Sequence, residues 1–331
     1  MKVDYEKLKD TIKKALMANG VDEKKSEIMA KVHADSNLYG INSHGLNRIP
    51  RLINFINDGL INLDGELELI KKTGAIENYD GNLGFGVINS IKAAKRVASL
   101  AKENGIAMVS VKNSTHWMRA GTYGNIIADM GMVGLLWTNT ESLMPVWGSD
   151  QKSIGNNPIC FAIPSDKGHI VLDMAISQYS YGKLDSTKIK GEKLPYPGGF
   201  DSRGVLTDDP QEIIESQRLL PIGYWKGSGL AICLDMMAAM LATGKSTYDM
   251  DDDNAFNCTG CSQVFIAMNP EAFSSKDDNE ALIEKIRKNI HSLGKGVHLP
   301  GEGALKRKKE NLENGVEVDK SYYDKVKSYV K

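Results

Sequence analysis

A long amphipathic segment that passes directly into a short apolar run limits what this chain can fold into. The spacing of the apolar residues predicts a helix over Phe85–Glu103, which ends at Asn104 and Gly105. The run Ile106–Val111, next along the chain, is rich in β-favouring residues and predicts a buried strand. A helix that leads straight into a buried strand is typical of a layered arrangement in which helices cover a sheet. We therefore expect an α/β fold.

The rest of the pattern extends this expectation along the chain. Further apolar runs predict strands at 66–72, 75–80, 132–138, 159–163 and 262–268. Helical periodicity recurs at 4–18, 22–38, 121–130, 230–241, 277–292, 303–314 and 319–330. We predict a mixed, largely buried sheet with helices on both faces and helical parts at both ends. The expected division is an N-terminal helical part at 1–65 that packs with the C-terminal helices, an α/β part at 66–300, and C-terminal helices at 301–331.

The size and charge of the chain exclude several classes of partner. Its 331 residues, 41% hydrophobic and 25% charged, can bury a large core in one large or two ordinary domains. With 41 basic and 42 acidic residues the net charge is -1, so no global field attracts nucleic acid or an anionic membrane. The N-terminus lacks the apolar stretch of a signal peptide, and no apolar run approaches the ~20 residues that span a bilayer. We expect a cytoplasmic protein that binds neither nucleic acid nor membrane.

The cysteines and the short motifs give no sign of a metal. Four cysteines in a chain of this length do not form a disulfide framework. Cys258 and Cys261 form a CTGC string, but a structural zinc site of that type needs a second pair. H-E-x-x-H, G-x-S-x-G and EF-hand strings are missing, and so is the G-x-G-x-x-G pattern of the Rossmann fold. We expect two unpaired thiols at a strand entrance, and no metal.

The stretch at 41–51, INSHGLNRIPR, holds the first candidate catalytic pair. Ser43 would cap a helix on which His44 and Arg48, four residues apart, share one face. At such a helix start Arg48 could hold a carboxylate while His44 transfers a proton, which suits the reduction of a 2-oxo acid. The alternative is a surface histidine beside a surface arginine.

Polar side chains in three later loops are further candidates for ligand contact. His116 and Arg119 lie in a loop after the strand at 106–111. The polar cluster Thr138–Thr140 ends another strand, where a strand end would open into a site. Asn156 suits a hydrogen bond to a substrate oxygen. A structural histidine at 116 and a turn-forming asparagine at 156 are the alternatives.

Two segments suit a dinucleotide. Asp173, near the end of the apolar run His169–Ala175, either contacts a ribose hydroxyl or caps the next segment. The string YWKGSG opens the apolar helix at 230–241; its glycines would let backbone amides approach a pyrophosphate and Lys226 adds a charge, although close helix packing also needs glycine. Residues 185–224, rich in Gly, Pro and Asp, are typical of a loop that covers an active site.

Seven short strings, in one order along the chain, resemble the malate/L-lactate dehydrogenase family, whose members lack a Rossmann fold. The strings are SHGLNRIPR at 43–51, HWMRAGTYG at 116–124, MPVWG at 144–148, IGNNP at 154–158, AIPS at 162–165, LPIGYWKGSG at 220–229 and LPGEG at 299–303. The likeness runs from Met1 to the C-terminus. It implies an NAD(P)H-dependent oxidoreductase of non-Rossmann fold that passes a hydride between nicotinamide and a 2-oxo or 2-hydroxy acid.

The resemblance also implies roles for individual residues. His44 is the expected proton donor during reduction, Arg48 clamps the substrate carboxylate, and His116 and Asn156 bind substrate oxygens. A homodimer that forms the cofactor cleft jointly is expected as well. The expected cofactor contacts are His169, Ile170, Val171, Leu172, Asp173, Met174, Ala175, Trp225, Lys226, Gly301, Glu302 and Gly303.

The sequence leaves three questions open. HWMRAGTYG and GYWKGSG favour a diketo sugar acid as substrate; malate, lactate or sulfolactate is one alternative, and a non-catalytic nucleotide- or sugar-acid-binding protein is another. NADH is the expected cofactor, but Lys167 or His169 could serve the 2′-phosphate of NADPH. A helix start lowers the pKa of a histidine, so a protonated His44 needs an anionic neighbour or the bound carboxylate itself.

Overall fold

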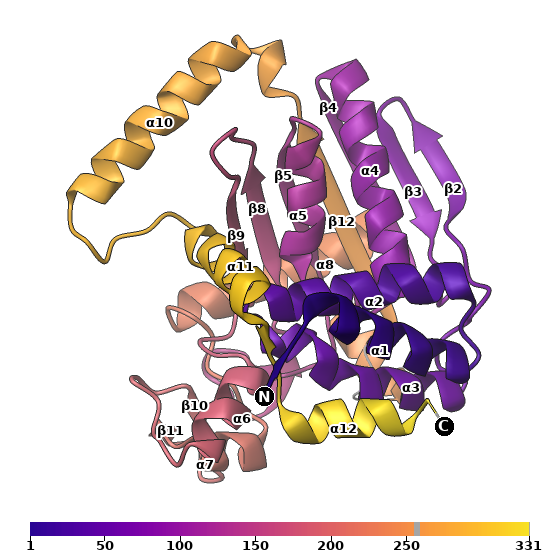
Figure 1. Ribbon diagram of the computed structural model, residues 1–331, viewed down its shortest axis with the longest axis vertical. Coiled ribbons are helices and arrows are strands. Elements are labelled where there is room, and N and C mark those ends of the chain that lie inside the picture. The colour runs from indigo at the N-terminus through magenta and orange to yellow at the C-terminus, as the bar shows by residue number, and fades with distance from the viewer. Residues whose placement is uncertain (255–258, 331) are drawn as a thin grey trace.

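One central sheet organises the molecule (Figure 1), for which a computed structural model describes residues 1–254 and 259–330. The sheet has seven strands in the order β2-β3-β4-β12-β5-β8-β9. Among the described strands of this sheet, only β3 and β4 run parallel. This is not the parallel sheet of a Rossmann fold, in line with the missing glycine fingerprint. The strands are β2 Glu68–Thr73, β3 Ile76–Asp80, β4 Ile106–Thr115, β5 Val133–Thr138, β8 Ile159–Ile163, β9 Ile170–Met174 and β12 Thr259–Met268.

The parallel pair results from the helix that the apolar spacing predicted. Helix α4, Gly86–Asn104, crosses from β3 to β4 and ends at Gly105, whose φ of 81° favours a residue without a side chain. The predicted helix and the strand after it are both confirmed. Strand β12 belongs to a much later part of the chain, yet it lies between β4 and β5 and pairs with both.

Helices cover both faces of the sheet. Successive residues of a strand point to opposite faces, and both faces carry apolar side chains that the helices bury. On β12, Phe265 packs into a core with α4 and α5 (Ala120–Asp129), whereas Val264 packs into a second core with α8 (Trp225–Ala242). In Figure 1, α4 and α5 lie in front of the sheet and α8 lies behind it. The predicted mixed sheet with helices on both faces is therefore confirmed.

The two ends of the chain share a third core. Residues from the first helices pack with Val316, Val318, Tyr323 and Val326 near the C-terminus, and strand β1 pairs with β13. This agrees with the expected packing of residues 1–65 against the C-terminal helices; the boundaries at 65 and 300 stay predictions. The elements are β1 Lys2–Val3, α1 Tyr5–Ala18, α2 Glu23–Leu38, α3 Ile49–Asn57, α11 Glu302–Asn314, β13 Val316–Glu317 and α12 Lys320–Ser328.

A small unit of short elements replaces the long loop that the sequence predicts at 185–224. Its helices are too short to show a readable period, yet they begin at good capping residues, Ser180 and Asp209, and bury Leu184 and Ile213. The prediction of an irregular loop is wrong in this respect. The elements are α6 Tyr181–Ile189, β10 Gly199–Phe200, β11 Leu206–Thr207 and α7 Pro210–Ser216.

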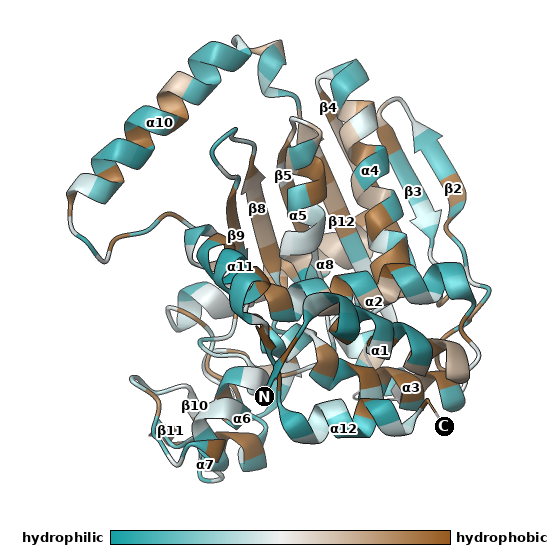
Figure 2. Ribbon diagram, in the orientation of Figure 1, coloured by the Kyte–Doolittle hydropathy of each residue, from teal (hydrophilic) through white to brown (hydrophobic). Residues whose placement is uncertain are grey.

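Further short elements and one long helix complete this part of the description. They are β6 Met144–Pro145, which pairs with β7 Lys152–Ile154, together with α9 Thr247–Asn254, the 3₁₀ turn η3 Pro270–Ala272 and α10 Lys276–Ser292. Helix α10 extends away from the body (Figure 1), and Figure 2 shows that its surface is mostly hydrophilic. Within the described residues, no single helix has the length and apolar composition to cross a membrane; only α8 and α9 together do, across a bend of 78°.

Candidate active site

A cavity of about 640 Å³ lies between the N-terminal helices, the ends of the sheet strands and the α6–α7 unit. It brings together His44, Arg48, His116 and Asn156, the four residues predicted to act on the substrate. They come from three separate parts of the chain. The cavity is also lined by Asn47, Arg51, Leu52, Phe55, Ile61, Thr115, Met118, Thr140, Glu141, Leu143, Lys152, Ser180, Tyr181, Gly182, Asp185, Ile214, Gln217 and Tyr322.

The segment that carries His44 is not the α-helix start that the sequence predicts. It forms two 3₁₀ turns, η1 Asn42–His44 and η2 Leu46–Arg48, separated by Gly45, and α3 begins only at Ile49. Ser43 lies inside the first of these turns and caps no helix. Helix α3 starts beside Pro50 because proline is favoured in the first turn of a helix. His44 and Arg48 reach the same cavity through the turn: Arg48 Nε donates to the carbonyl oxygen of Ser43 at 2.7 Å.

Two buried side chains of α2 hold this turn in place. Asn37 Oδ1 accepts from the backbone amide of Leu46 at 2.7 Å, and a side chain at Gly45 would collide with Asn37. His33 is completely buried, and its Nδ1 lies 3.2 Å from the carbonyl oxygen of Gly45. A carbonyl can only accept, so Nδ1 of His33 carries the proton. Burial lowers the pKa of His33 to about 4, so the ring is neutral.

His44 and His116 face one another with their rings stacked, 6.0 Å apart and inclined by 23°. The amide of Met118 donates to Nδ1 of His116 at 2.9 Å, which places the proton of the neutral ring on Nε2. Nδ1 of His44 lies 2.8 Å from the hydroxyl of Ser43. Both rings are therefore oriented by short contacts within their own loops.

Both histidines are uncharged, because burial and neighbouring cations disfavour the imidazolium form. Burial and the charges of Arg48 and Arg119 lower the pKa of His44 to about 3, and burial with nearby His44, Arg48 and Arg51 holds the pKa of His116 well below its usual value. The charged and titratable neighbours that act on the His44 ring are Arg48, Arg119 and His33, and each of them lowers its pKa.

Asn156 lines the cavity, while its neighbour forms the turn. Asn157 is buried at a φ of 26°, accepts from the amide of Thr140 at 3.0 Å and donates to the carbonyl of Ala231 at 2.8 Å. Asn156 Oδ1 accepts from the Thr140 hydroxyl at 3.2 Å, which leaves its amide hydrogens as the donors of this side chain. The structural asparagine of the pair is thus Asn157.

Several residues that line the cavity were not among the predicted site residues. They are Arg51, Glu141, Lys152, Tyr181, Asp185 and Gln217. Glu141 directly follows the polar strand end at Thr138–Thr140 that was expected to open into a site, so one signal was present. Arg51 ends the string SHGLNRIPR at 43–51, so a second signal was present. The other four belong to a short strand, a short helix and a connection with no distinctive motif.

Two of the three predicted cofactor segments lie side by side. Strand β9 is the last strand of the sheet, and the loop before α11 rests along its outer edge, where the amide of Val171 donates to the carbonyl of Pro300 at 3.2 Å. Gly301 has a φ of 93°, and a side chain there would lie within 3.2 Å of the Val171 backbone. The fold therefore joins His169–Ala175 to Gly301–Gly303, with the N-terminus of α11 at the junction.

Asp173 has a structural partner that the sequence could not reveal. Its Oδ2 accepts from the amide of Gly121 at 2.8 Å and lies 3.7 Å from Arg119, whose guanidinium stacks 4.8 Å from the ring of Tyr39. Asp173 thus caps α5 rather than the segment after β9, and burial raises its pKa. Glu302 is engaged as well: its oxygens accept from Arg287 and His291, each at 2.9 Å.

The third cofactor segment is YWKGSG at 224–229, and the helix that it opens begins earlier than predicted. Helix α8 begins at Trp225, so Gly227 and Gly229 lie inside its first turns. A side chain at Gly227 would lie 2.1 Å from the carbonyl oxygen of Ile222, whereas one at Gly229 would meet nothing within 4 Å. Gly227 is therefore required for close packing, the alternative given for these glycines. The segment remains near β9, because the amide of Ile222 donates to the carbonyl of Ile176 at 2.8 Å.

Both side chains considered for a 2′-phosphate lie beside acids. Lys167 pairs with Glu284, and Nε2 of His169 lies 2.9 Å from Asp129. Nδ1 of His169 accepts from the amide of Ser165 at 3.1 Å.

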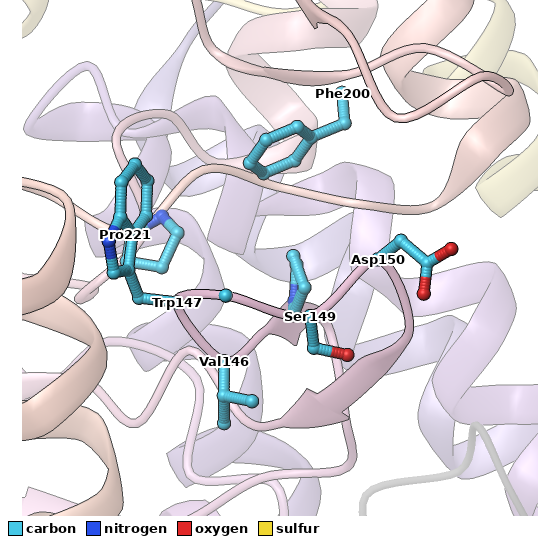
Figure 3. A pocket seen from close by; sticks show the side chains of 8 residues that line it. Val146, Trp147, Ser149, Asp150, Phe200 and Pro221 are labelled. Atoms are coloured by element: carbon cyan, nitrogen blue, oxygen red, sulfur yellow. The ribbon is translucent and has the colours of Figure 1, made fainter.

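A second cavity of about 620 Å³ lies beyond the start of α8 (Figure 3). Trp147, Phe200 and Pro221 line it with Val146 and Ser149, and among its described lining residues only Asp150 is titratable. Trp147 packs against Tyr224 with the rings 5.3 Å apart. Because these lining residues include neither a histidine nor a cation, the cavity does not suit proton transfer to an acid.

The described residues 1–254 and 259–330 contain no group of three or more metal-binding side chains. Cys160 and Cys233 are free thiols, the first buried and the second exposed. Cys258 lies outside the described residues, so the expected unpaired state of the CTGC string stays a prediction.

Comparison with known proteins identifies the family. The model of the malate/L-lactate dehydrogenase family matches residues 3–327. The 2,3-diketo-L-gulonate reductases of Citrobacter koseri and Escherichia coli O17:K52:H18 are 37% and 38% identical over 333 residues, which cover 99% of this chain and 100% of each relative.

Solved structures agree. Sulfolactate dehydrogenase from Methanocaldococcus jannaschii superposes with a TM-score of 0.87 at 31% identity, over 99% of this chain and 96% of that one. Malate dehydrogenase from Entamoeba histolytica shares the fold, with a TM-score of 0.93 at 24% identity over 99% and 97% of the two chains. The chain therefore belongs to the malate/L-lactate dehydrogenase family of oxidoreductases.

Proposed function

We propose that this protein uses NADH to reduce the C2 carbonyl of 2,3-diketo-L-gulonate, giving 3-keto-L-gulonate. The single observation that carries the proposal is the cavity in which His44, Arg48, His116 and Asn156 converge. The full-length likeness to 2,3-diketo-L-gulonate reductases supports this substrate. A cavity of about 640 Å³ also has room for a six-carbon acid.

In this reaction Arg48 holds the substrate carboxylate, and the carboxylate prepares His44. A negative charge beside Arg48 offsets the cation that depresses the pKa of His44, so binding raises that pKa and loads the ring with a proton. His44 then gives this proton to the C2 oxygen as the carbonyl becomes a hydroxyl. His116, neutral with its proton on Nε2, and the Asn156 amide donate hydrogen bonds to substrate oxygens.

The bound cofactor supplies the hydride. We assign its binding to the edge formed by His169–Ala175 and Gly301–Gly303, with Trp225 and Lys226 at the start of α8. The close approach at Gly301 and the amides of the α11 N-terminus suit a dinucleotide. NADH is preferred over NADPH because Lys167 and His169 are already paired with acids. No metal takes part.

We further propose a cytoplasmic homodimer. The outer face of α8 leaves Met236 and Met240 64% and 70% exposed, a surface that a second copy of the chain would bury. The free thiols of Cys160 and Cys233 suit a reducing compartment.

A second candidate function is reduction of an acid with two anionic groups, such as the sulfonated or dicarboxylic type, since Arg51 and Lys152 also line the cavity.

The proposal is tested by mixing the purified protein with NADH and 2,3-diketo-L-gulonate in the presence of a chelator. We expect loss of the long-wavelength absorbance of NADH, at a rate that the chelator does not change. Pyruvate and oxaloacetate serve as comparison substrates, and NADPH as comparison cofactor. Tight NADH binding without turnover of any 2-oxo acid would instead support a binding protein.

A further inference from the structure

One arginine of α10 connects two of the segments to which we assign the cofactor. Helix α10 extends from the body of the molecule (Figure 1), yet the side chain of Arg287 is only 12% exposed. Its guanidinium contacts α10 itself, the turn at 165–168 that precedes β9, and the first residue of α11. The turn leads into His169–Ala175, and Glu302 belongs to Gly301–Gly303. One side chain thus reaches both segments.

Every nitrogen of this guanidinium has a partner. Nε donates to Glu284 at 2.9 Å, and Nη1 donates to Glu302 at 2.9 Å. Nη2 donates to the carbonyl oxygen of Gly168 at 3.1 Å and to the hydroxyl of Ser165 at 3.3 Å. A guanidinium is planar and its donors point in fixed directions, so it meets all of these acceptors together in one arrangement of the three elements. Arg287 therefore fixes the distance between the turn and the start of α11.

The two segments also meet directly, but over a small area. The amide of Val171 donates to the carbonyl of Pro300 at 3.2 Å. The side chain of Leu305 lies against Gly168, where an added side chain would come within 2.9 Å of it. These contacts join the strand to the loop, and Arg287 adds three charged hydrogen bonds that reach α11 and the turn together.

Other side chains of α10 hold the same turn. Glu280 accepts from the amide of Asp166 at 3.0 Å, and Glu284 pairs with Lys167. These contacts fix α10 on the turn before β9. Arg287 extends the connection to α11, so that helix, turn and the start of α11 form one unit.

The carboxylate of Glu302 has further partners besides Arg287. His291 lies 2.9 Å from Oε2, and the amide of Leu299 donates to the same oxygen at 2.9 Å. Both partners remain when Arg287 is replaced, so Glu302 keeps its local contacts. What is lost is the connection from Glu302 to the turn before β9.

We propose that Arg287 is a positioning residue for the cofactor: it joins the turn at 165–168 to the first residue of α11 and so holds the two cofactor segments at the spacing that a bound dinucleotide needs. The inference rests on the proposed function, because it assumes that NADH lies along these segments. The described lining residues of the cavity around His44 do not include Arg287. Its replacement therefore acts on cofactor affinity and not on the chemical step.

The test compares the parent with Arg287→Met and Arg287→Lys, using NADH fluorescence for the Kd and 2,3-diketo-L-gulonate for turnover. We expect Arg287→Met to raise both the Kd and the KM for NADH about tenfold, because the free site is no longer held in its binding arrangement. The kcat at saturating NADH should change by less than about threefold. Arg287→Lys keeps the charge but meets fewer acceptors, so its Kd should lie between the two.

Arg96→Met is the matched control for a loss of stability. Arg96 donates to both oxygens of Glu77, at 2.7 and 2.6 Å, and joins α4 to β3 near the opposite end of the sheet from β9. The side chain of Glu77 is 1% exposed, so loss of this arginine should lower the melting temperature. The Kd for NADH should nevertheless keep its parental value.

Each outcome distinguishes the inference from the proposed function. If the parent binds neither NADH nor NADPH, the proposed function fails. If the parent binds NADH and reduces a 2-oxo acid while Arg287→Met keeps the parental Kd, the inference alone is overturned. An equal rise in Kd in Arg96→Met would also contradict it, because the effect would then follow from stability. If Arg287→Met does not fold, Arg287→Lys decides: it must raise the Kd at least about threefold with kcat unchanged, and a parental Kd overturns the role of Arg287.

Discussion

At the scale of single residues, the charge state of His44 determines when this side chain can donate a proton. An imidazole whose pKa lies near 3 holds almost no proton at neutral pH, so the free enzyme is a poor acid. In the proposed reaction, the carboxylate of the substrate would supply the missing negative charge beside Arg48. In the proposed reaction, substrate binding and activation of the acid would then be the same event.

Replacement of His44 measures its part in the chemistry. We expect His44→Gln to lower kcat by about 10²–10⁴-fold, the usual contribution of a positioned general acid. NADH binding, followed by fluorescence, should not change, because none of the assigned cofactor segments includes residue 44. A variant with parental kcat would remove His44 from the mechanism. His116→Gln is the matched comparison and should reduce kcat less, since this ring donates a hydrogen bond and keeps its proton.

The buried histidines also make stability depend on pH. His33 has a pKa of about 4 in the folded protein and about 6.5 when exposed in the unfolded chain. Its contribution is fully present above pH ~6.5 and is lost as the pH falls through about 4, because only the unfolded state takes up the proton. The free energy of unfolding from urea titrations should therefore fall by on the order of 3 kcal/mol from this group over that window. His33→Gln should flatten the fall; an equally steep curve would refute this origin.

At the scale of elements, the sequence predicts single helices and strands better than it predicts the segments whose shape depends on tertiary contacts. Helix α4 and strand β8 were predicted almost to the residue, because apolar spacing is a local signal. The 3₁₀ turns around His44 were not, since contacts from Asn37 and His33 impose them. The same holds for the site: residues in recognisable motifs were found, whereas Glu141 and Tyr181 enter the cavity through distant connections without motifs.

The start of α8 allows a test that separates cofactor binding from packing. Lys226→Ala removes an exposed charge and should raise the Kd for NADH by roughly 10- to 100-fold, with a smaller effect at high salt. Gly227→Val should instead lower the melting temperature, because its side chain would displace the Ile222 backbone. Gly229→Ala, at an open position, is the control. Parental NADH affinity in Lys226→Ala would move the phosphate site to Gly301–Gly303.

At the scale of the whole molecule, the exposed face of α8 predicts the oligomeric state. Met236→Glu together with Met240→Glu should weaken the dimer by at least about 100-fold, because burying a methionine contributes about 1.5–3 kcal/mol. Sedimentation velocity over a range of concentrations measures this. Ile189→Glu, 79% exposed at the end of α6, should leave the dimer intact. A parent that sediments as a monomer at every concentration would exclude the interface.

The place of β12 in the sheet has a consequence for synthesis on the ribosome. Strands β4 and β5 are complete at residue 138, but the strand that joins them begins only at residue 259. At ~5–20 residues per second, translation leaves both strand edges unpaired for roughly 6–24 seconds. Open edges recruit strands from other chains. We therefore expect a product truncated before β12 to aggregate more readily than the full chain.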